Sequence, residues 1–132
     1  MRTLAVFFLM AAAGCHVPIG FDPALYPPAR RATGTTAYVS LAAASLQGEL
    51  LEVRDTALVL RTVDSIVLVL TSRTTSLDFE DHRRRRRVHD SLTAEEREKL
   101  RLLSRYPQGI PPAALAQLLA DRGQTTLKVI DK

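Results

Sequence analysis

The chain has 132 residues, a length that suits one modest domain and not two. Its formal net charge of +4 is too small to name a polyanionic partner, and its single cysteine excludes a disulfide framework within the chain. Only 5% of the residues are aromatic and Trp is absent, so the core must consist mainly of Leu, Val, Ile and Ala.

Residues 1–14 have the layout of an export signal. Arg2 supplies a positive charge, and residues 4–13 form an apolar run that is too short to cross a bilayer comfortably as a permanent helix. Small residues then lead to the only cysteine, in Ala12-Ala13-Gly14-Cys15. This run resembles the lipobox of bacterial lipoprotein precursors. The alternatives are an ordinary secretory signal with an incidental cysteine, or a buried N-terminal helix.

The resemblance implies that residues 1–14 are a lipoprotein signal peptide and that Cys15 is acylated and becomes the first residue after cleavage. More than one buried acyl chain suffices for stable anchoring, so the membrane is the first expected partner. Removing Arg2 leaves 17 basic against 14 acidic residues, a charge of about +3. His16 stands where family members retained at the inner membrane tend to have Asp. The resemblance therefore implies an outer-membrane location facing the periplasm.

Residues 15–36 are rich in Pro and Gly, which predicts an extended tether. Proline fixes its own backbone angle and removes a hydrogen-bond donor, so this segment favours neither a helix nor a central strand. Its role would be to hold the folded domain away from the bilayer. Alternatively, the apolar side chains of Ile19, Phe21, Leu25 and Tyr26 dock on the domain.

Residues 37–80 predict a small antiparallel β-domain. Short runs of β-branched and aliphatic residues, separated by tight polar turns, indicate strands near 38–41, 48–53, 57–61 and 66–71, and a further one near 74–79. Residues 66–70 are apolar at every position, which favours a central strand covered on both faces over an apolar helix. Gly48 lies early in its strand, where the missing Cβ lets the chain bend sharply.

One pattern in this region is similar to the core of Sm-like and other SH3-like small barrels. It consists of an early glycine, spaced apolar residues and a turn aspartate: Gly48, Leu50, Val53, Asp55, Leu58 and Leu60. The resemblance implies a strongly curved sheet or a small barrel. The RNA-binding loop residues of the Sm-like family have no match here, so the resemblance implies an architecture and no activity.

Residues 81–91 form an Arg-rich segment that contains Arg83, Arg84, Arg85, Arg86 and Arg87. The favoured interpretation is a solvated loop or helix start whose charge is partly neutralised by nearby Asp and Glu residues. The second is a site for anionic envelope polymer or lipid headgroups, and nucleic acid is the least favoured ligand. His82 and His89 flank the run, but five adjacent cations would repel a metal ion, so no metal site is expected.

Residues 92–123 predict a helical hairpin. Thr93 and Glu96 form a capping box that opens a first helix ending near Pro107, and a second helix covers residues 113–122. Their leucines must pack on each other, on the sheet or on a partner. The run 100–109 resembles a segment of uncharacterised bacterial envelope proteins, which implies no activity. Residues 124–132 are either an edge strand or a frayed tail.

The sequence thus predicts an α+β fold, with a small curved antiparallel sheet or barrel followed by a C-terminal helical hairpin. No clustered acid, base, nucleophile or phosphate loop indicates catalysis or a cofactor. We expect a non-enzymatic, membrane-anchored envelope lipoprotein that acts as a binding or structural module. In this interpretation apolar helix residues such as Leu118 contact an envelope protein partner. The alternative is an anionic-polymer binder that uses Arg83–Arg87.

Overall fold

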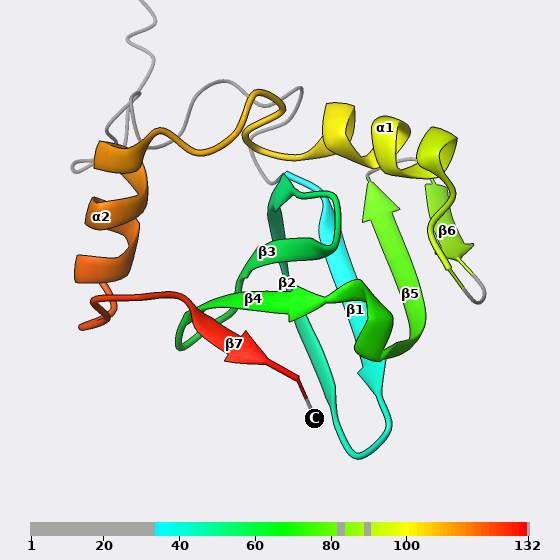
Figure 1. The fold of residues 1–132 in the computed structure, drawn as a ribbon, viewed down its shortest axis with the longest axis horizontal. Coiled ribbons are helices and arrows are strands. Elements are labelled where there is room, and N and C mark those ends of the chain that lie inside the picture. The colour runs from blue at the N-terminus through cyan, green and yellow to red at the C-terminus, as the bar shows by residue number, and fades with distance from the viewer. Residues whose placement is uncertain (1–33, 82–83, 89–90, 132) are drawn as a thin grey trace, which may run out of the picture.

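The computed structural model describes residues 34–81, 84–88 and 91–131, and its strands form one seven-stranded sheet (Figure 1). The strand order is β6-β5-β1-β2-β3-β4-β7, and every neighbouring pair is antiparallel except β4 and β7. The sheet is not closed, so the α+β class is confirmed with a curved sheet in place of a barrel. The strands are β1 (Thr36–Leu41), β2 (Ser45–Val53), β3 (Ala57–Arg61), β4 (Ile66–Leu70), β5 (Thr74–Asp81), β6 (Arg84–Val88) and β7 (Lys128–Ile130).

A β-bulge in β2 bends the sheet. The register with β3 shifts between Leu50 and Glu52, which makes Leu51 the extra residue. Leu50 and Val53 therefore reach the same hydrophobic cluster although their spacing is odd, while Leu51 enters a second cluster. In Figure 1 the strands β3 and β4 accordingly run across the direction of β1, β2 and β5.

The sheet has a hydrophobic cluster on each face. In β4, Val67 and Val69 belong to one cluster and Ile66 to the other, so the prediction that this strand is covered on both faces is confirmed. The first cluster collects buried residues from β1 to β6 and Leu100 of helix α1 (Ala94–Leu103). The second includes Leu118 of helix α2 (Pro112–Ala120).

The two helices follow one another in the chain, but each packs on its own face of the sheet. Figure 1 shows α1 beside β5 and β6 and α2 on the side of β3 and β4. The capping box of α1 is confirmed, because the Thr93 hydroxyl accepts a hydrogen bond from the Glu96 amide and the Glu96 carboxylate accepts one from the Thr93 amide. Among the three options for the leucine stripes, the structure therefore shows packing on the sheet.

The two edge strands of the sheet come from segments for which the sequence allows more than one structure. A 3₁₀ turn, η1 (Thr71–Arg73), leads from β4 into β5, which pairs with β1 on one side and β6 on the other. Arg84–Val88 is thus a strand, and its interpretation as a loop or helix start is wrong. Residues 128–130 form the edge strand β7, parallel to β4. Within the described residues, no helix is both long and apolar enough to cross a membrane.

Candidate functional site: the arginine edge strand

The β5–β6 hairpin sets acidic residues of β5 opposite arginines of β6. Asp78 pairs with Arg87, Glu80 with Arg85 and Asp81 with Arg84, while Phe79 lies opposite Arg86. Opposite charges on facing strands stabilise a sheet, and like charges destabilise it. The apolar pair Leu77 and Val88 closes the same ladder. The run of arginines therefore matches the acidic pattern that precedes it in the chain.

Asp78 is the centre of the hairpin's charge network. Arg87 donates from Nε to Oδ1 at 2.9 Å and from Nη2 to Oδ2 at 3.1 Å, and Arg85 donates from Nη2 to Oδ2 at 3.0 Å. The Asp78 side chain is 8% exposed, whereas those of Arg85 and Arg87 are 59% exposed. The two hydrogen bonds from Arg87, and then the one from Arg85, lower the pKa of Asp78 to about 2 in spite of its desolvation. At neutral pH one ionised carboxylate thus holds two guanidinium groups.

Tyr38 of β1 extends this network across a third strand. Its hydroxyl donates to Glu80 Oε2 at 3.1 Å, and the guanidinium carbon of Arg85 lies 5.2 Å from the centre of its ring, within cation–π range. The hydrogen bond to Glu80 raises the pKa of Tyr38. Formal charges on this face of the hairpin balance, because Asp78 and Glu80 compensate Arg85 and Arg87.

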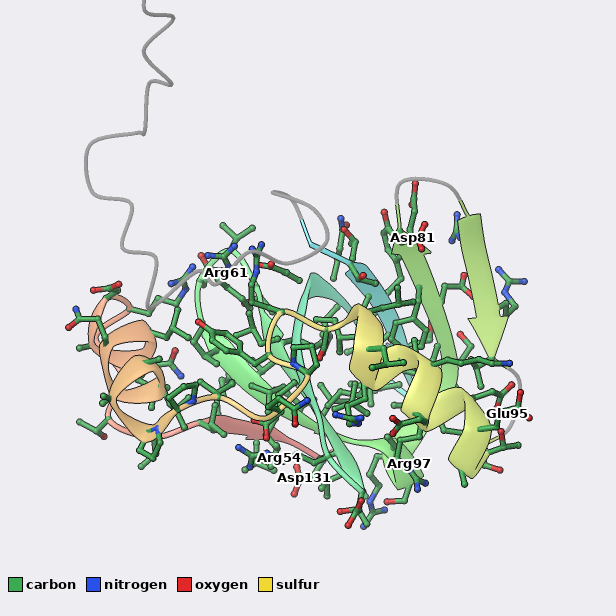
Figure 2. The ribbon with its side chains drawn as sticks, turned by 90° about the horizontal axis from the view of Figure 1, so that it is seen from above. Arg54, Arg61, Asp81, Glu95, Arg97 and Asp131 are labelled. Carbon is green, nitrogen blue, oxygen red and sulfur yellow. The ribbon has the colours of Figure 1, made fainter. Side chains whose placement is uncertain are left out.

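A second charged group lies elsewhere on the sheet and joins β2, β3 and the chain after α1. Arg105 Nε donates to Glu49 Oε1 at 2.6 Å, and Arg61 pairs with the other oxygen of Glu49. The side chains of Glu49 and Arg105 are 8% and 4% exposed. Figure 2 shows Asp81 at the end of β5 beside β6 and Arg61 well apart from it, so the two charged groups are separate.

The backbone beside Arg105 explains what this second group does. The amides of Arg105 and Tyr106 donate to the carbonyl oxygens of Leu50 and Leu51 at 3.0 and 2.8 Å, at the bulge of β2. The Thr35 hydroxyl also donates to the carbonyl oxygen of Leu103 at 2.9 Å. These bonds fasten the chain that links the two helices to the bend of the sheet, which indicates a structural role for the Glu49 ion pairs.

A hollow of about 210 Å³ lies between α1 and the β5–β6 hairpin. Its apolar lining comes from Phe79, Val88, Leu100 and Leu103. Its charged lining is already engaged: Lys99 donates to Glu95 at 2.6 Å, Glu96 is part of the capping box, and Arg87 binds Asp78. The hollow therefore has room for a small apolar group, but each charged side chain that lines it already has a partner within the protein.

The structure describes some of the predicted site residues and leaves others outside the described ranges. Cys15, Arg83, His82 and His89 lie outside the described residues, as do residues 1–14 and most of the predicted tether. Within the residues that are described, no group of three or more His, Cys, Asp or Glu side chains is placed to hold a metal ion. Of the five consecutive arginines, the four at positions 84–87 are described and lie on β6.

The sequence alone does not single out Asp78 among the Asp and Glu residues near the arginine run. In the structure it is the carboxylate that binds both Arg85 and Arg87. A signal for this pairing is present in the sequence. Asp78 and Glu80 alternate with other residues, and arginines follow after a gap short enough for a β-hairpin turn. The partner-binding interpretation uses Leu118 as a contact residue, but Leu118 is fully buried among the residues of the second cluster.

The chain matches no protein-family model, and no curated protein or solved structure is significantly similar to it.

Proposed function

We propose that this chain is a non-enzymatic bacterial envelope lipoprotein, anchored through Cys15, whose sheet domain is a binding or structural module. The observation that carries the proposal is the order of Arg2, an apolar run, small residues and a lone cysteine. Cys15 precedes the first strand residue, Thr36, by 36 − 15 = 21 residues. At roughly 3.3–3.6 Å per extended residue, this length lets the domain work as much as about 70 Å from its anchor.

The charges of the domain support a structural and binding role. Among the described residues, Glu49 and Asp78 each form ion pairs with two arginines, and those pairs join different strands or loops. These ion pairs hold backbone elements in place. The surface that this framework presents at one end of the sheet is the arginine strand β6.

The proposal is tested by labelling cells with radioactive palmitate and fractionating their membranes. We expect label and membrane association for the wild type and for His16→Ala, a matched change next to the cysteine. Cys15→Ser should lose both, because only the thiol can carry the thioether lipid. Mass spectrometry of the mature protein should place its N-terminus at Cys15 with added lipid mass. Unlabelled, soluble wild-type protein would rule out the anchor.

The second candidate is a binder of anionic envelope polymer or lipid headgroups through Arg83–Arg87. The exposure of Arg85 and Arg87 at the sheet edge favours it, whereas their ion pairs with Asp78 reduce the charge that they offer. Polymer binding predicts retention on an anionic matrix that falls steeply as salt rises and that is lost when all five arginines become Gln. A partner-binding role predicts little change in retention.

A further inference from the structure

We infer that β6 is a docking edge for an extended acidic segment of a partner protein, which adds to the sheet as a strand beside it. This inference rests on the proposed binding role and names the chemistry of the partner. In the sheet order β6 is terminal, and within the described residues it pairs with β5 alone. The proposed docking site is the other backbone edge of β6, the one that faces away from β5.

The backbone of β6 suits strand addition. Its residues, Arg84–Val88, include neither proline nor glycine, and all of them are in register with β5. An edge strand of this kind presents a row of amide and carbonyl groups on its outer side. Extended peptides bind such edges through main-chain hydrogen bonds, while side chains at alternate positions provide the specificity.

The charges of β6 select which segment can add. Its inner neighbour β5 shows the preferred chemistry, because it places Asp78, Glu80 and Asp81 opposite three of the arginines. Four arginines at 84–87 against three acids leave a formal excess of one positive charge on the described hairpin. An outer strand with acidic residues would compensate this excess.

The same charges disfavour pairing of β6 with the β6 strand of a second copy of this chain. A second copy of β6 would place arginine opposite arginine, which is unfavourable on facing strands. Charged edge residues are a known protection against edge-to-edge association of a protein with itself. The arginine strand therefore discriminates between copies of this chain and an acidic segment, and only the second fits.

The guanidinium groups of Arg85 and Arg87 reach back over β5 to Asp78, and they leave N–H donors that an outer strand can use. Both side chains are more than half exposed and lie on the face opposite to the buried Val88. Arg87 uses Nε and Nη2 on Asp78, and Arg85 uses Nη2. A guanidinium has five N–H donors, so each arginine can also bind a carboxylate from an outer strand.

The test measures binding of synthetic peptides to the detergent-solubilised full chain. One peptide has the 8-residue length of β5 and alternates Glu with Thr, and a second has the same sequence with alternate backbone amides methylated. Strand addition predicts binding of the first peptide, new hydrogen-exchange protection of β6 amides, and at least about ten-fold weaker binding of the methylated peptide. Equal binding of both peptides, or protection elsewhere, would overturn the inference in favour of simple charge attraction.

Variants locate the peptide on the protein. Arg84→Gln with Arg86→Gln should weaken binding by about ten-fold, because it removes two charges from the edge while leaving the Asp78 ion pairs in place. Arg54→Gln with Lys128→Gln removes the same charge from the β2–β3 turn and from β7, and should leave binding unchanged. Equal losses in the two double variants would contradict docking at β6.

The outcome is separable from that of the anchoring proposal. Cys15→Ser protein should bind the peptide as the wild type does, since β6 does not depend on the lipid. Anionic vesicles and polyphosphate serve as competitors. If they displace the peptide completely from the wild type at low concentration, or if no peptide binds to a protein that incorporates palmitate, the acidic-segment inference fails and the lipoprotein proposal stands.

Discussion

Arg87 holds Asp78 at two points, with Nε on Oδ1 at 2.9 Å and Nη2 on Oδ2 at 3.1 Å. The two residues face each other on β5 and β6, so these hydrogen bonds join the edge strand β6 to the rest of the sheet. Asp78 is buried, and its neighbours in β5, Leu77 and Phe79, belong to the first hydrophobic cluster. The ion pair therefore helps to keep the arginine edge in place.

Acid should release this edge earlier than the rest of the sheet. The Asp78 pKa is depressed from 3.8 to about 2 in the folded protein, so its contribution to stability is fully present above the unfolded value near 3.8. That contribution is lost as the pH falls from there through 2, because the unfolded state binds the proton more readily. Asp78→Asn lacks the titrating group, so its free energy of unfolding should fall less steeply over this range.

Urea unfolding at a series of pH values from 5 to about 2 measures this difference. Asp64→Asn makes the same change at an exposed position between β3 and β4 and serves as the matched control. Parallel pH profiles for the wild type and Asp78→Asn would show that the ion pair does not contribute to stability.

Local signals explain why much of the sheet and the start of α1 could be predicted. The run Ile66–Leu70 is short, apolar and rich in β-branched residues, and it forms a strand that is paired on both sides and covered on both faces, as those properties indicate. Thr93 and Glu96 are three residues apart, which is the distance that a capping box requires within one helical turn. Both features depend on neighbouring residues in the chain and need no tertiary information.

The arginine strand could not be predicted because its signal is not local. Five consecutive arginines have neither alternation nor β-branched residues, and like charges favour a solvated state. The strand exists because β5 supplies facing acids, Asp78 above all, and because Val88 is buried opposite Leu77. The separation of the two helices is likewise not a local property, because Leu100 of α1 packs in the first cluster and Leu118 of α2 in the second, on the other face of the sheet.

Gly48→Ala should destabilise the sheet. A Cβ at this position would lie 2.7 Å from the carbonyl oxygen of Arg61, a backbone atom that cannot rotate away. We expect a loss of roughly 1–3 kcal/mol, the range for forced overpacking. Gly123→Asn is the control, because nothing lies within 4 Å of a Cβ there and Asn tolerates the positive φ of 65°. Thermal unfolding that is unchanged in Gly48→Ala would refute the close contact between β2 and β3.

Gln124→Glu should loosen the edge formed by β4 and β7. The Gln124 side chain accepts from the Ile66 amide at 2.7 Å and donates from Nε2 to the Ile66 carbonyl oxygen at 3.0 Å, as a backbone neighbour would. Glu keeps the acceptor but loses the donor and sets a negative charge beside that oxygen. We expect a cost of about 1–3 kcal/mol.

Hydrogen exchange of the β4 and β7 amides should increase in the Gln124→Glu variant, and urea unfolding should report the loss of stability. Gln117→Glu is the matched control, because its amide bonds to Asp121 on the exposed side of α2. If exchange increases equally in both variants, the effect comes from added charge and not from the bond to Ile66.

Leu118→Ala should cost about 2–5 kcal/mol, because it removes a fully buried side chain from the second cluster. Leu102→Ala deletes the same atoms from a side chain that is 46% exposed on α1, and its cost should be within about 0.5 kcal/mol. Urea unfolding curves of both variants measure the difference. Equal costs would contradict the packing of α2 on the sheet. Because Leu118 is fully buried, any partner lost by Leu118→Ala reports altered packing of α2 and not a lost direct contact, and Leu102→Ala is the variant that tests α1 as a contact surface.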